Sequence, residues 1–530
     1  MDLTSFAGPF LPEILLLAGT LLIFLLDVLR VRRNEVVGAV ALGSIALALL
    51  FVLADLGFAP LAVLATISPS SINAPAPGSP LYTFTSLGLV FQGLFLVAAL
   101  LVSLASLSRP SRERGAPIFY GLLVLATLGM LLVAIASDLI FLLLAIEVVS
   151  IPTYLLVAYT RRDTRALEAA MKFYIIGALS TTLSFFGASL LYGAYGTTNL
   201  YAIAYGLPGA ATSYPVLILL GYGFLIAGLA FKATLVPFHA WAVDVYDGAP
   251  HDVSAFLAGG SKKVGLFAFF LVFLAPILLV RTVSSGSPFM TGSVAIGPVL
   301  QITLAVLAVV TMTVGNVLAL LQKEMKRMLA YSSISQAGYM LIGIAVGTAP
   351  ALAGATLQIF AHVFMKTGAF LVVGAVAALG VGPLISDWKG LGQRRPLLGL
   401  AFGLMLLSLA GVPLTVGFVS KFVLFSAAVQ AQGYFVWLAV AGLLNSALSV
   451  FYYARVLKVL YFDAPDPRAL GSGAVVGGSE PELLPVGGLG YGRAAAIALV
   501  AVVIVALGVY PQVVLGPIQS AAQHFVNLGA

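Results

Sequence analysis

Charged residues are scarce in this sequence of 530 residues. Asp, Glu, Lys and Arg make up 8% of it, whereas about a quarter of the residues in an ordinary soluble protein are charged. Hydrophobic residues make up 61%, and the mean hydropathy is +1.10. No water-soluble domain covers its surface with so few charges, so the composition predicts an integral membrane protein surrounded largely by the lipid bilayer.

Cysteine is absent, which excludes disulfides, thiolate-bound iron–sulfur clusters, cysteine-bound zinc and cysteine nucleophiles. The sequence also lacks the glycine-rich phosphate-binding motifs, GxGxxG after a strand and GxxxxGK(S/T). Its histidines are scattered and show no metal-ligand spacing: they are His239, His251, His362 and His524. We therefore expect no metal site and no bound nucleotide in this chain.

Long apolar stretches, separated by turn residues and charge clusters, predict an all-α polytopic membrane protein with about 14 spans. The first stretch lacks a basic leading region, so we interpret it as a retained helix and not as a cleaved signal peptide. The predicted spans are 11–29, 36–57, 82–107, 117–136, 138–159, 169–193, 214–238, 253–280, 296–321, 328–347, 352–379, 397–427, 434–460 and 494–515.

Positive charges alternate from loop to loop. Every second loop is basic, whereas residues 58–80 and 194–213 contain no Lys or Arg. The positive-inside rule then predicts an even span count with both termini outside, so the net charge of +7 marks a cytoplasmic face and not a nucleic-acid surface. The basic loop residues are Arg30, Arg32, Arg33, Arg109, Arg112, Arg114, Arg161, Arg162, Arg165, Lys323, Lys326, Arg327, Lys389, Arg394, Arg395 and Arg468.

Two loops differ from this pattern. The loop after the seventh span is acidic, with Asp244, Asp247 and Asp252. Residues 463–492 are rich in Gly and Pro, and we expect this loop to be mobile or to lie along a partner.

A few charges remain inside the predicted spans: Glu147, Lys232, Lys262, Lys263, Lys366 and Lys421. Each Lys at the bilayer centre costs roughly 2.5–3.5 kcal/mol. Such groups persist when they face a hydrated interior, pair with each other or transfer protons; snorkelling or a structural ion pair is the alternative. Adjacent residues point about 100° apart on a helix, so we expect only one of Lys262 and Lys263 to face the shared interior.

Two of these lysines have a helix breaker nearby. Lys232 precedes Pro237, and Lys421 follows Pro413. Broken helices beside a charge are typical of transporter cavities, although a simple packing kink is the alternative. Lys232 and Lys421 are 189 residues apart, about the offset between spans 5 and 10, which predicts two five-span units. An odd number of spans per unit inverts the second unit, an arrangement typical of ion transporters.

The resulting organisation is an N-terminal three-helix segment (1–115), a first five-helix repeat (116–283), a second inverted repeat (294–462) and a C-terminal loop and helix (463–530). His362 and Lys366 are four residues apart and share one helix face. Nearby residues could hold water or form interhelical hydrogen bonds: Tyr331, Ser332, Ser333, Ser335 and Gln336.

These charges together suggest a proton path. Glu147 would stabilise the protonated form of Lys232, and separation of the pair would push the proton on to Lys262. His362 and Lys366 would relay it to Lys421, because imidazole and buried amines exchange protons near neutral pH. We treat this path as a hypothesis.

Four segments resemble the antiporter-like subunits of respiratory complex I: IEVVSIPTYLLVAY, FKATLVPFHAWAVDVYDGAPHDVSAFLAGGSKKVGLF, LLQKEMKRMLAYSSISQAGYMLIG and SLAGVPLTVGFVSKF. DVYDGAP and the Lys of the twelfth span are similar to the subunit N branch. The resemblance implies a proton-pumping membrane-arm subunit of an NADH-quinone oxidoreductase, in which Glu147, Lys232, Lys262 and Lys421 are the key residues. It also implies that flavin, iron–sulfur clusters and quinone belong to partner subunits.

The chain departs from that branch at a few positions. Val243 stands where Pro is usual, and His251 and Asp252 stand where Thr-Pro is usual; these two residues are either a titratable pair or loop surface. His362 and Lys366 are more similar to the sibling subunits. Alternatives are a subunit of an Mrp-type Na⁺/H⁺ antiporter or membrane-bound hydrogenase relative, a stand-alone solute symporter, or a structural scaffold. The electron donor, the quinone and H⁺ versus Na⁺ stay open, and a prokaryotic cell membrane is favoured.

Overall fold

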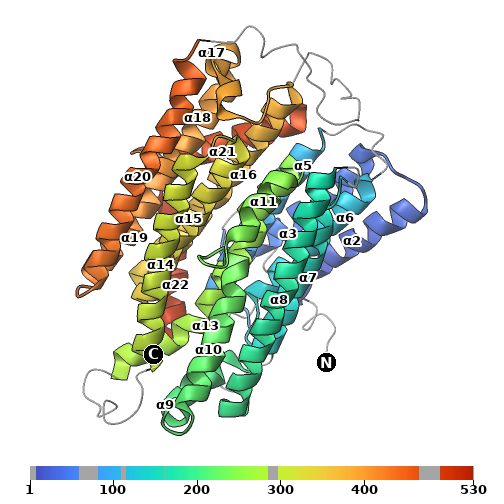
Figure 1. Ribbon diagram of the computed structural model, residues 1–530. Coiled ribbons are helices and arrows are strands. Elements are labelled where there is room, and N and C mark those ends of the chain that lie inside the picture. The colour runs from blue at the N-terminus through green and yellow to red at the C-terminus, as the bar shows by residue number, and fades with distance from the viewer. Residues whose placement is uncertain are drawn as a thin grey trace.

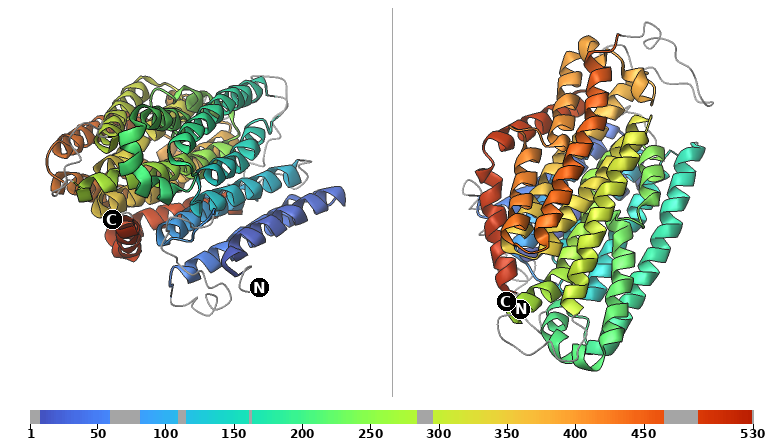
Figure 2. Two further views of the ribbon diagram at one scale, coloured as in Figure 1. Left: turned by 90° about the horizontal axis from the view of Figure 1, so that it is seen from below. Right: turned by 60° about the vertical axis from the view of Figure 1, so that its left-hand side comes forward.

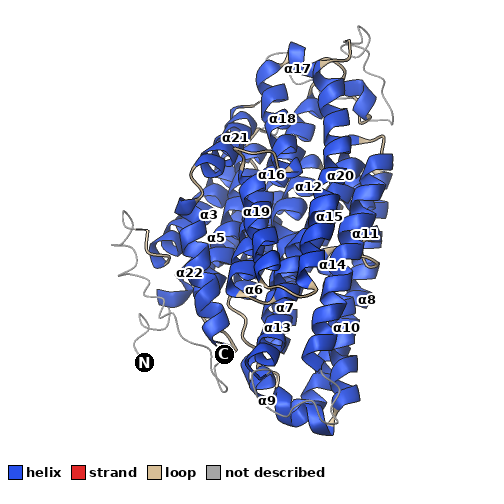
Figure 3. Cartoon of the chain, turned by 90° about the vertical axis from the view of Figure 1, so that its left-hand side faces the viewer, coloured by secondary structure: helices blue, strands red, loops and turns tan. Residues whose placement is uncertain are grey.

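The computed structural model describes residues 8–58, 81–108, 115–160, 163–283, 296–464 and 490–528. Within these ranges the regular elements are helices, and the only β-type pairings are three isolated bridges, such as Tyr82 with Ala136 (Figure 3). Thirteen of the described helices are long and apolar enough to cross a membrane. The chain is therefore an all-helical, multi-pass membrane protein, as its composition predicts.

The helices follow the predicted spans closely (Figure 1). The N-terminal segment consists of η1 (Gly8–Phe10), α2 (Leu11–Val28), α3 (Asn34–Asp55) and α5 (Ser86–Ser106). The next group is α6 (Ala116–Ala134), α7 (Leu139–Val157), α8 (Thr164–Tyr195), α10 (Pro215–Ala233), α11 (Ala240–Gly248), α12 (His251–Phe256) and α13 (Lys262–Val283). The third group is α14 (Ile296–Leu321), α15 (Met325–Val346), α16 (Ala349–Ala378), α18 (Pro396–Ala410), α19 (Val416–Gln430) and α20 (Phe435–Tyr461).

Capping residues at the loops define where several helices begin. Asp138 is the N-cap of α7, and its carboxylate accepts from the backbone N–H groups of Ile140 and Phe141 at 2.9 and 3.1 Å. Thr85 and Thr348 cap α5 and α16 in the same way. These side chains satisfy backbone donors that have no partner inside the helix, so the ends of long apolar helices are fixed by single polar residues.

Two spans are broken where the sequence predicts it. The seventh span stops at the end of α10, where Thr234 adopts a left-handed conformation (φ 58°), and restarts as α11 after Pro237. The twelfth span stops at the end of α18, where Gly411 is left-handed (φ 91°), and restarts as α19 after Pro413. Both breaks leave backbone carbonyls without helical partners, which is tolerated in a membrane only inside the protein.

The eighth span contains an irregularity that hydropathy does not reveal. Between α12 and α13 lies a π turn, η3 (Leu257–Ser261), which precedes Lys262 directly. Gly265, in the next turn, lies so close to α10 that a Cβ there would be 2.4 Å from the backbone nitrogen of Ala233. The π turn and this close contact place the two lysines of α13 beside the end of α10.

Three helices form the centre of the bundle. The most apolar stretches of the eighth span, α15 and α16 are 100%, 94% and 94% buried, whereas that of α8 is 33% buried. The N-terminal and C-terminal segments lie together at one side, as the blue and red helices in the left view of Figure 2 show. The lysines of the central helices are therefore shielded by protein on all sides.

The structure differs from the predicted organisation in two places. Residues 194–213, predicted as a loop, contain the helix α9 (Leu200–Ser213). The last predicted span corresponds to α21 (Tyr491–Val509), but a further helix, α22 (Gln512–Leu528), turns away from it and runs down the edge of the bundle in the right view of Figure 2.

Two short helices, η4 (Ile385–Trp388) and α17 (Leu391–Arg394), form the end opposite α9 in Figure 1. Most of the Gly/Pro-rich loop, residues 465–489, lies outside the described residues.

Candidate functional site

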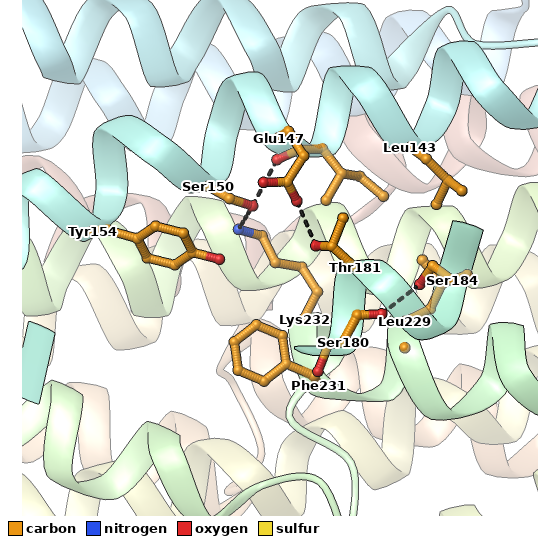
Figure 4. A pocket seen from close by; sticks show the side chains of 12 residues that line it. Leu143, Glu147, Ser150, Tyr154, Ser180, Thr181, Ser184, Leu229, Phe231 and Lys232 are labelled. Atoms are coloured by element: carbon orange, nitrogen blue, oxygen red, sulfur yellow. Dashed lines mark hydrogen bonds between the residues drawn. The ribbon is translucent and has the colours of Figure 1, made fainter. Parts of the chain in front are cut away.

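Glu147 and Lys232 lie at the first broken helix, on α7 and at the end of α10. The Lys232 amine donates to the hydroxyl of Ser150 at 3.0 Å, and the Glu147 carboxylate accepts from Thr181 of α8 at 2.6 Å. Figure 4 shows the amine pointing at Ser150, with the Glu147 carboxyl beside it. The predicted pair is therefore brought together, but Lys232 bonds to the serine and not to the glutamate.

A small cavity surrounds this group. Its polar lining comes from α7, α8 and α10, and it has about 20 Å³ of space open to the centre of a water molecule. A water needs roughly 10–15 Å³ of such space, so the cavity holds about one. Lys232 is 3% exposed, whereas Glu147 is only half-buried. The cavity is therefore lined by both a buried amine and a partly exposed carboxyl group.

Lys262 and Lys263 follow the π turn and contact different helices. The Lys262 amine donates to the backbone oxygen of Ser333 on α15 at 2.6 Å. The Lys263 amine lies 2.7 Å from Nδ1 of His362 on α16 and donates to the backbone oxygen of Ala258 at 3.2 Å. The expectation that only one of the two lysines faces the interior is wrong, because both are buried and each has its own neighbour.

His362 and Lys366 lie one turn apart on α16, as their spacing predicts. The Lys366 amine donates to the backbone oxygen of Leu329 at 2.8 Å and to the hydroxyl of Ser332, both on α15. Nε2 of His362 is buried and has no hydrogen-bond partner. His362 therefore joins Lys263 and leaves its second ring nitrogen free, which suits a group that passes a proton between neighbours.

Lys421 lies on α19 and reaches back to the second helix break. Its amine donates to the backbone oxygens of Leu409 and Ala410 at 2.9 and 3.0 Å, and to the hydroxyl of Ser446 on α20 at 2.9 Å. The amine also lies 5.2 Å from the ring centroid of Tyr339. The broken end of α18 thus supplies the free carbonyls that hold this lysine, which explains why a break and a lysine occur together.

Uncharged polar residues connect α15, α16, α18 and α19. Gln358 donates to the side-chain oxygen of Gln336 at 2.6 Å and accepts from Ser420 at 2.5 Å. Gln336 donates to the Leu409 oxygen at 3.3 Å, the same oxygen that accepts from Lys421. Gln336, Ser332 and Ser333 of α15 therefore make interhelical hydrogen bonds, one of the two roles considered for them.

Several residues that make these contacts are not evident from the sequence. Gln358, Ser420, Ser446, Ser150 and Thr181 carry no charge and do not stand out in a hydropathy profile. Gln358 could have been found, because it precedes His362 by four residues and so lies on the same face of α16 as His362 and Lys366.

The acidic residues of α11 and α12 have their own set of partners. Asp244 accepts from Lys172 at 2.9 Å and from Arg327 at 3.2 Å. Asp252 pairs with Arg493 at 3.1 Å, with side chains 4% and 14% exposed. These residues lie on α11 and α12, so the reading of His251 and Asp252 as loop surface is wrong. Each of the two aspartates offsets cations at the end of the bundle that carries Lys172, Arg327 and Arg493, which we call the basic end.

Lys326 is a helix residue and not, as the charge pattern predicts, part of a basic loop. It lies in the first turn of α15 and is 9% exposed. Its amine donates to the backbone oxygens of Asp247 and Ala249 at 2.6 and 2.8 Å. These oxygens end α11, where a cation is favourable. Among the described residues, no cluster of His, Asp and Glu could hold a metal ion.

Comparison with known proteins identifies the family. Residues 136–449, more than half of the chain, match the family described as NADH:quinone oxidoreductase/Mrp antiporter, TM. The chain belongs to this family. The matched region contains both broken helices and every interior lysine described above.

Individual members of the NADH:quinone oxidoreductase/Mrp antiporter family match over most of the chain. F(420)H(2) dehydrogenase subunit N of Methanosarcina mazei is 41% identical over 86% of this chain and 89% of its own length. NADH-quinone oxidoreductase subunit N of Myxococcus xanthus is 35% identical over 98% and 97%. A chain of respiratory complex I from Thermus thermophilus has a TM-score of 0.72 at 30% identity, covering 95% of this chain and 98% of its own.

Proposed function

We propose that this chain is a proton-translocating membrane-arm subunit of an NADH-quinone oxidoreductase of the complex I type. The names of its relatives and their full-length coverage support this assignment. Electron transfer then takes place on partner subunits, which carry the flavin, the iron–sulfur clusters and the quinone site. The chain itself contributes proton transfer coupled to quinone reduction.

One observation carries the proposal. Lys262, Lys263, Lys366 and Lys421 are fully or almost fully buried, and their amines are held by carbonyl oxygens, hydroxyls and an imidazole. Neutral acceptors leave an amine free to lose its proton without stranding a negative charge in the membrane. A column of such amines can therefore exchange protons, which a set of permanent ion pairs cannot do.

The positions of these groups along the bundle support one order for the path. Lys232 lies at the first broken helix beside Glu147 and the small cavity. Lys262 and Lys263 follow on α13, and His362 and Lys366 continue on α16. The amides of Gln336 and Gln358 connect that region with the Leu409 oxygen, which also binds Lys421. Protons move along this order with water filling the intervals, and Glu147 promotes charging of Lys232.

Topology and repeat structure belong to the same proposal. Residues 116–283 and 294–462 are the two inverted units, since each contains a span broken beside a lysine. The C-terminal end of α22 lies at the α9 end of the bundle in Figure 1, opposite α17 with Arg394. Because basic loops stay on the cytoplasmic side, both termini lie outside a prokaryotic cell membrane.

The test is proton translocation by the assembled complex in proteoliposomes, measured together with quinone reduction. Lys232→Ala and Glu147→Ala should each abolish or strongly reduce proton uptake per electron pair. Lys389→Ala is the matched control, because Lys389 is exposed and lies between η4 and α17. Normal pumping by both interior variants would refute the proposal.

Purification provides a separate check on the assignment. The complex should contain flavin and iron–sulfur proteins that reduce quinone, and the electron donor they accept decides between NADH and another reductant. A complex that lacks these proteins and exchanges Na⁺ for H⁺ would instead support the Mrp-type alternative.

A further inference from the structure

A second buried carboxyl group lies outside the proposed proton path. Glu13, in the first turn of α2, is 5% exposed, and the Gln92 side chain of α5 is 1% exposed. The Gln92 amide nitrogen donates to Oε1 of Glu13 at 2.7 Å. This contact joins the first and third spans, in the segment that precedes the two proposed repeats.

The rest of this pair has no hydrogen bond. Oε2 of Glu13 and Oε1 of Gln92 are both buried, and neither has a partner. Two buried acceptors without a donor are costly. A proton on Glu13 would supply the missing donor, and an acid and an amide then form two complementary hydrogen bonds.

The charges around Glu13 point the same way. α2 packs against α3 and α6. α3 contributes Asp55, whose negative charge acts on Glu13. The one titratable residue of α6 is Tyr120. α5 contains no Asp, Glu, Lys, Arg or His. Among the described residues no cation pairs with Glu13. The N-terminal turn of α2 favours an anion, but a desolvated carboxylate without a cation is disfavoured more strongly.

We propose that Glu13 is a proton-binding site: it holds a proton at neutral pH and binds Gln92 as a neutral acid–amide pair that joins α2 to α5. The pair fixes the N-terminal segment to the bundle without placing a charge in the membrane.

Infrared spectroscopy of the purified complex in lipid tests the proposal. A protonated carboxyl has a C=O stretching band above the amide region, which an ionised carboxylate lacks. At neutral pH this band should be present, move to lower frequency in heavy water, and disappear in Glu13→Gln. Glu35→Gln is the matched control, because Glu35 is an exposed glutamate on α3. An unchanged spectrum in Glu13→Gln would overturn the proposal.

A second variant separates the protonation state from stability. Gln92→Leu removes the amide, so the Glu13 band should persist but move to higher frequency as its hydrogen bond is lost. Glu13→Gln should keep the melting temperature of the complex, because a glutamine also makes two hydrogen bonds with Gln92. A carboxylate band in place of the acid band in Gln92→Leu would show that Glu13 is ionised and would overturn the proposal.

Discussion

Charged residues are held in two different ways in the centre of this protein and at its basic end. At the basic end, Asp244 and Asp252 pair with Lys172, Arg327 and Arg493 at 2.9–3.2 Å. In the centre, the lysines of α13, α16 and α19 donate to uncharged groups, and among the described residues no carboxylate accepts from them.

Under the proposed function, this difference separates charges that stabilise the fold from groups that exchange protons. The buried pair of Asp252 and Arg493 costs several kcal/mol to break, so it stays charged, whereas the more exposed pairs of Asp244 contribute less. A lysine held by carbonyls and hydroxyls has no such partner, so its charge depends on hydration and on neighbouring amines. Four sets of substitutions test this difference between paired charges and lysines held by uncharged groups.

The largest effect is expected at Lys421. Lys421→Met keeps the buried side-chain volume but removes the amine that binds Leu409, Ala410 and Ser446. Proton translocation by the assembled complex should fall by about a hundredfold or more, the size expected for loss of a proton-transfer group. Lys389→Met, at an exposed site, should leave the rate unchanged. A Lys421→Met complex that assembles and pumps normally would contradict the difference between paired charges and lysines held by uncharged groups.

The buried ion pair at the basic end should affect stability instead. Asp252→Ala leaves Arg493 without its partner, which should lower the free energy of unfolding by about 3–5 kcal/mol. Thermal denaturation of the purified complex measures this loss. Asp252→Leu combined with Arg493→Leu should recover most of it, since no charge is then left unpaired. If the double variant is as unstable as the single one, packing and not charge pairing explains the effect.

A smaller change is expected in the amide connection between α15 and α16. Gln358→Leu leaves the side-chain oxygen of Gln336 without its donor, at a cost of about 1–3 kcal/mol, whereas the hydroxyl of Ser420 keeps the Gly417 oxygen as an acceptor. Adding Ser420→Ala should not restore the melting temperature, because the hydroxyl still donates to the Gly417 oxygen in the single variant. Pumping should slow in both variants, because the link toward Lys421 is interrupted. An unchanged pumping rate would show that protons bypass these amides.

The smallest effect is expected at Asp244. Burial opposes its ionisation, but hydrogen bonds from Lys172 and Arg327 hold the pKa of Asp244 below its usual range. A depressed carboxyl pKa stabilises the fold above the ordinary value and loses this contribution as the pH falls toward the folded-state pKa. Asp244→Asn should therefore cost about 1 kcal/mol or less, as for other exposed pairs, and the cost should not vary between about pH 5 and 8. A cost that grows across this range would contradict the assignment.

The sequence predicted those features that carry charge or break a helix. Lys232, Lys421, Pro237 and Pro413 stand out because a membrane span tolerates few charges and few breaks. The family resemblance selected Glu147 and the same lysines. The fold class followed from composition alone, because a chain with so little charge has few ways to be stable in water.

Other features depend on packing that no profile reveals. The π turn before Lys262 is a local shift in backbone hydrogen bonds, so the sequence could not show that both lysines are buried. Glu13 escaped notice because a carboxyl in the first turn of a span resembles an interfacial residue. α22 was missed because its 17 residues are amphipathic and contain Pro517, which makes them unlike a complete span.

The π turn at Leu257–Ser261 also determines what the following helix presents to its neighbours. A turn with i→i+5 bonding contains one residue more than a regular turn, and each residue turns the helix by about 100°. Everything after the turn is therefore rotated relative to everything before it. Removing one glycine from this turn would rotate Lys262 away from Ser333 and Lys263 away from His362. The composition of the span would hardly change. The neighbours of the two proposed proton carriers are thus determined by the rotation of this helix as much as by its side chains.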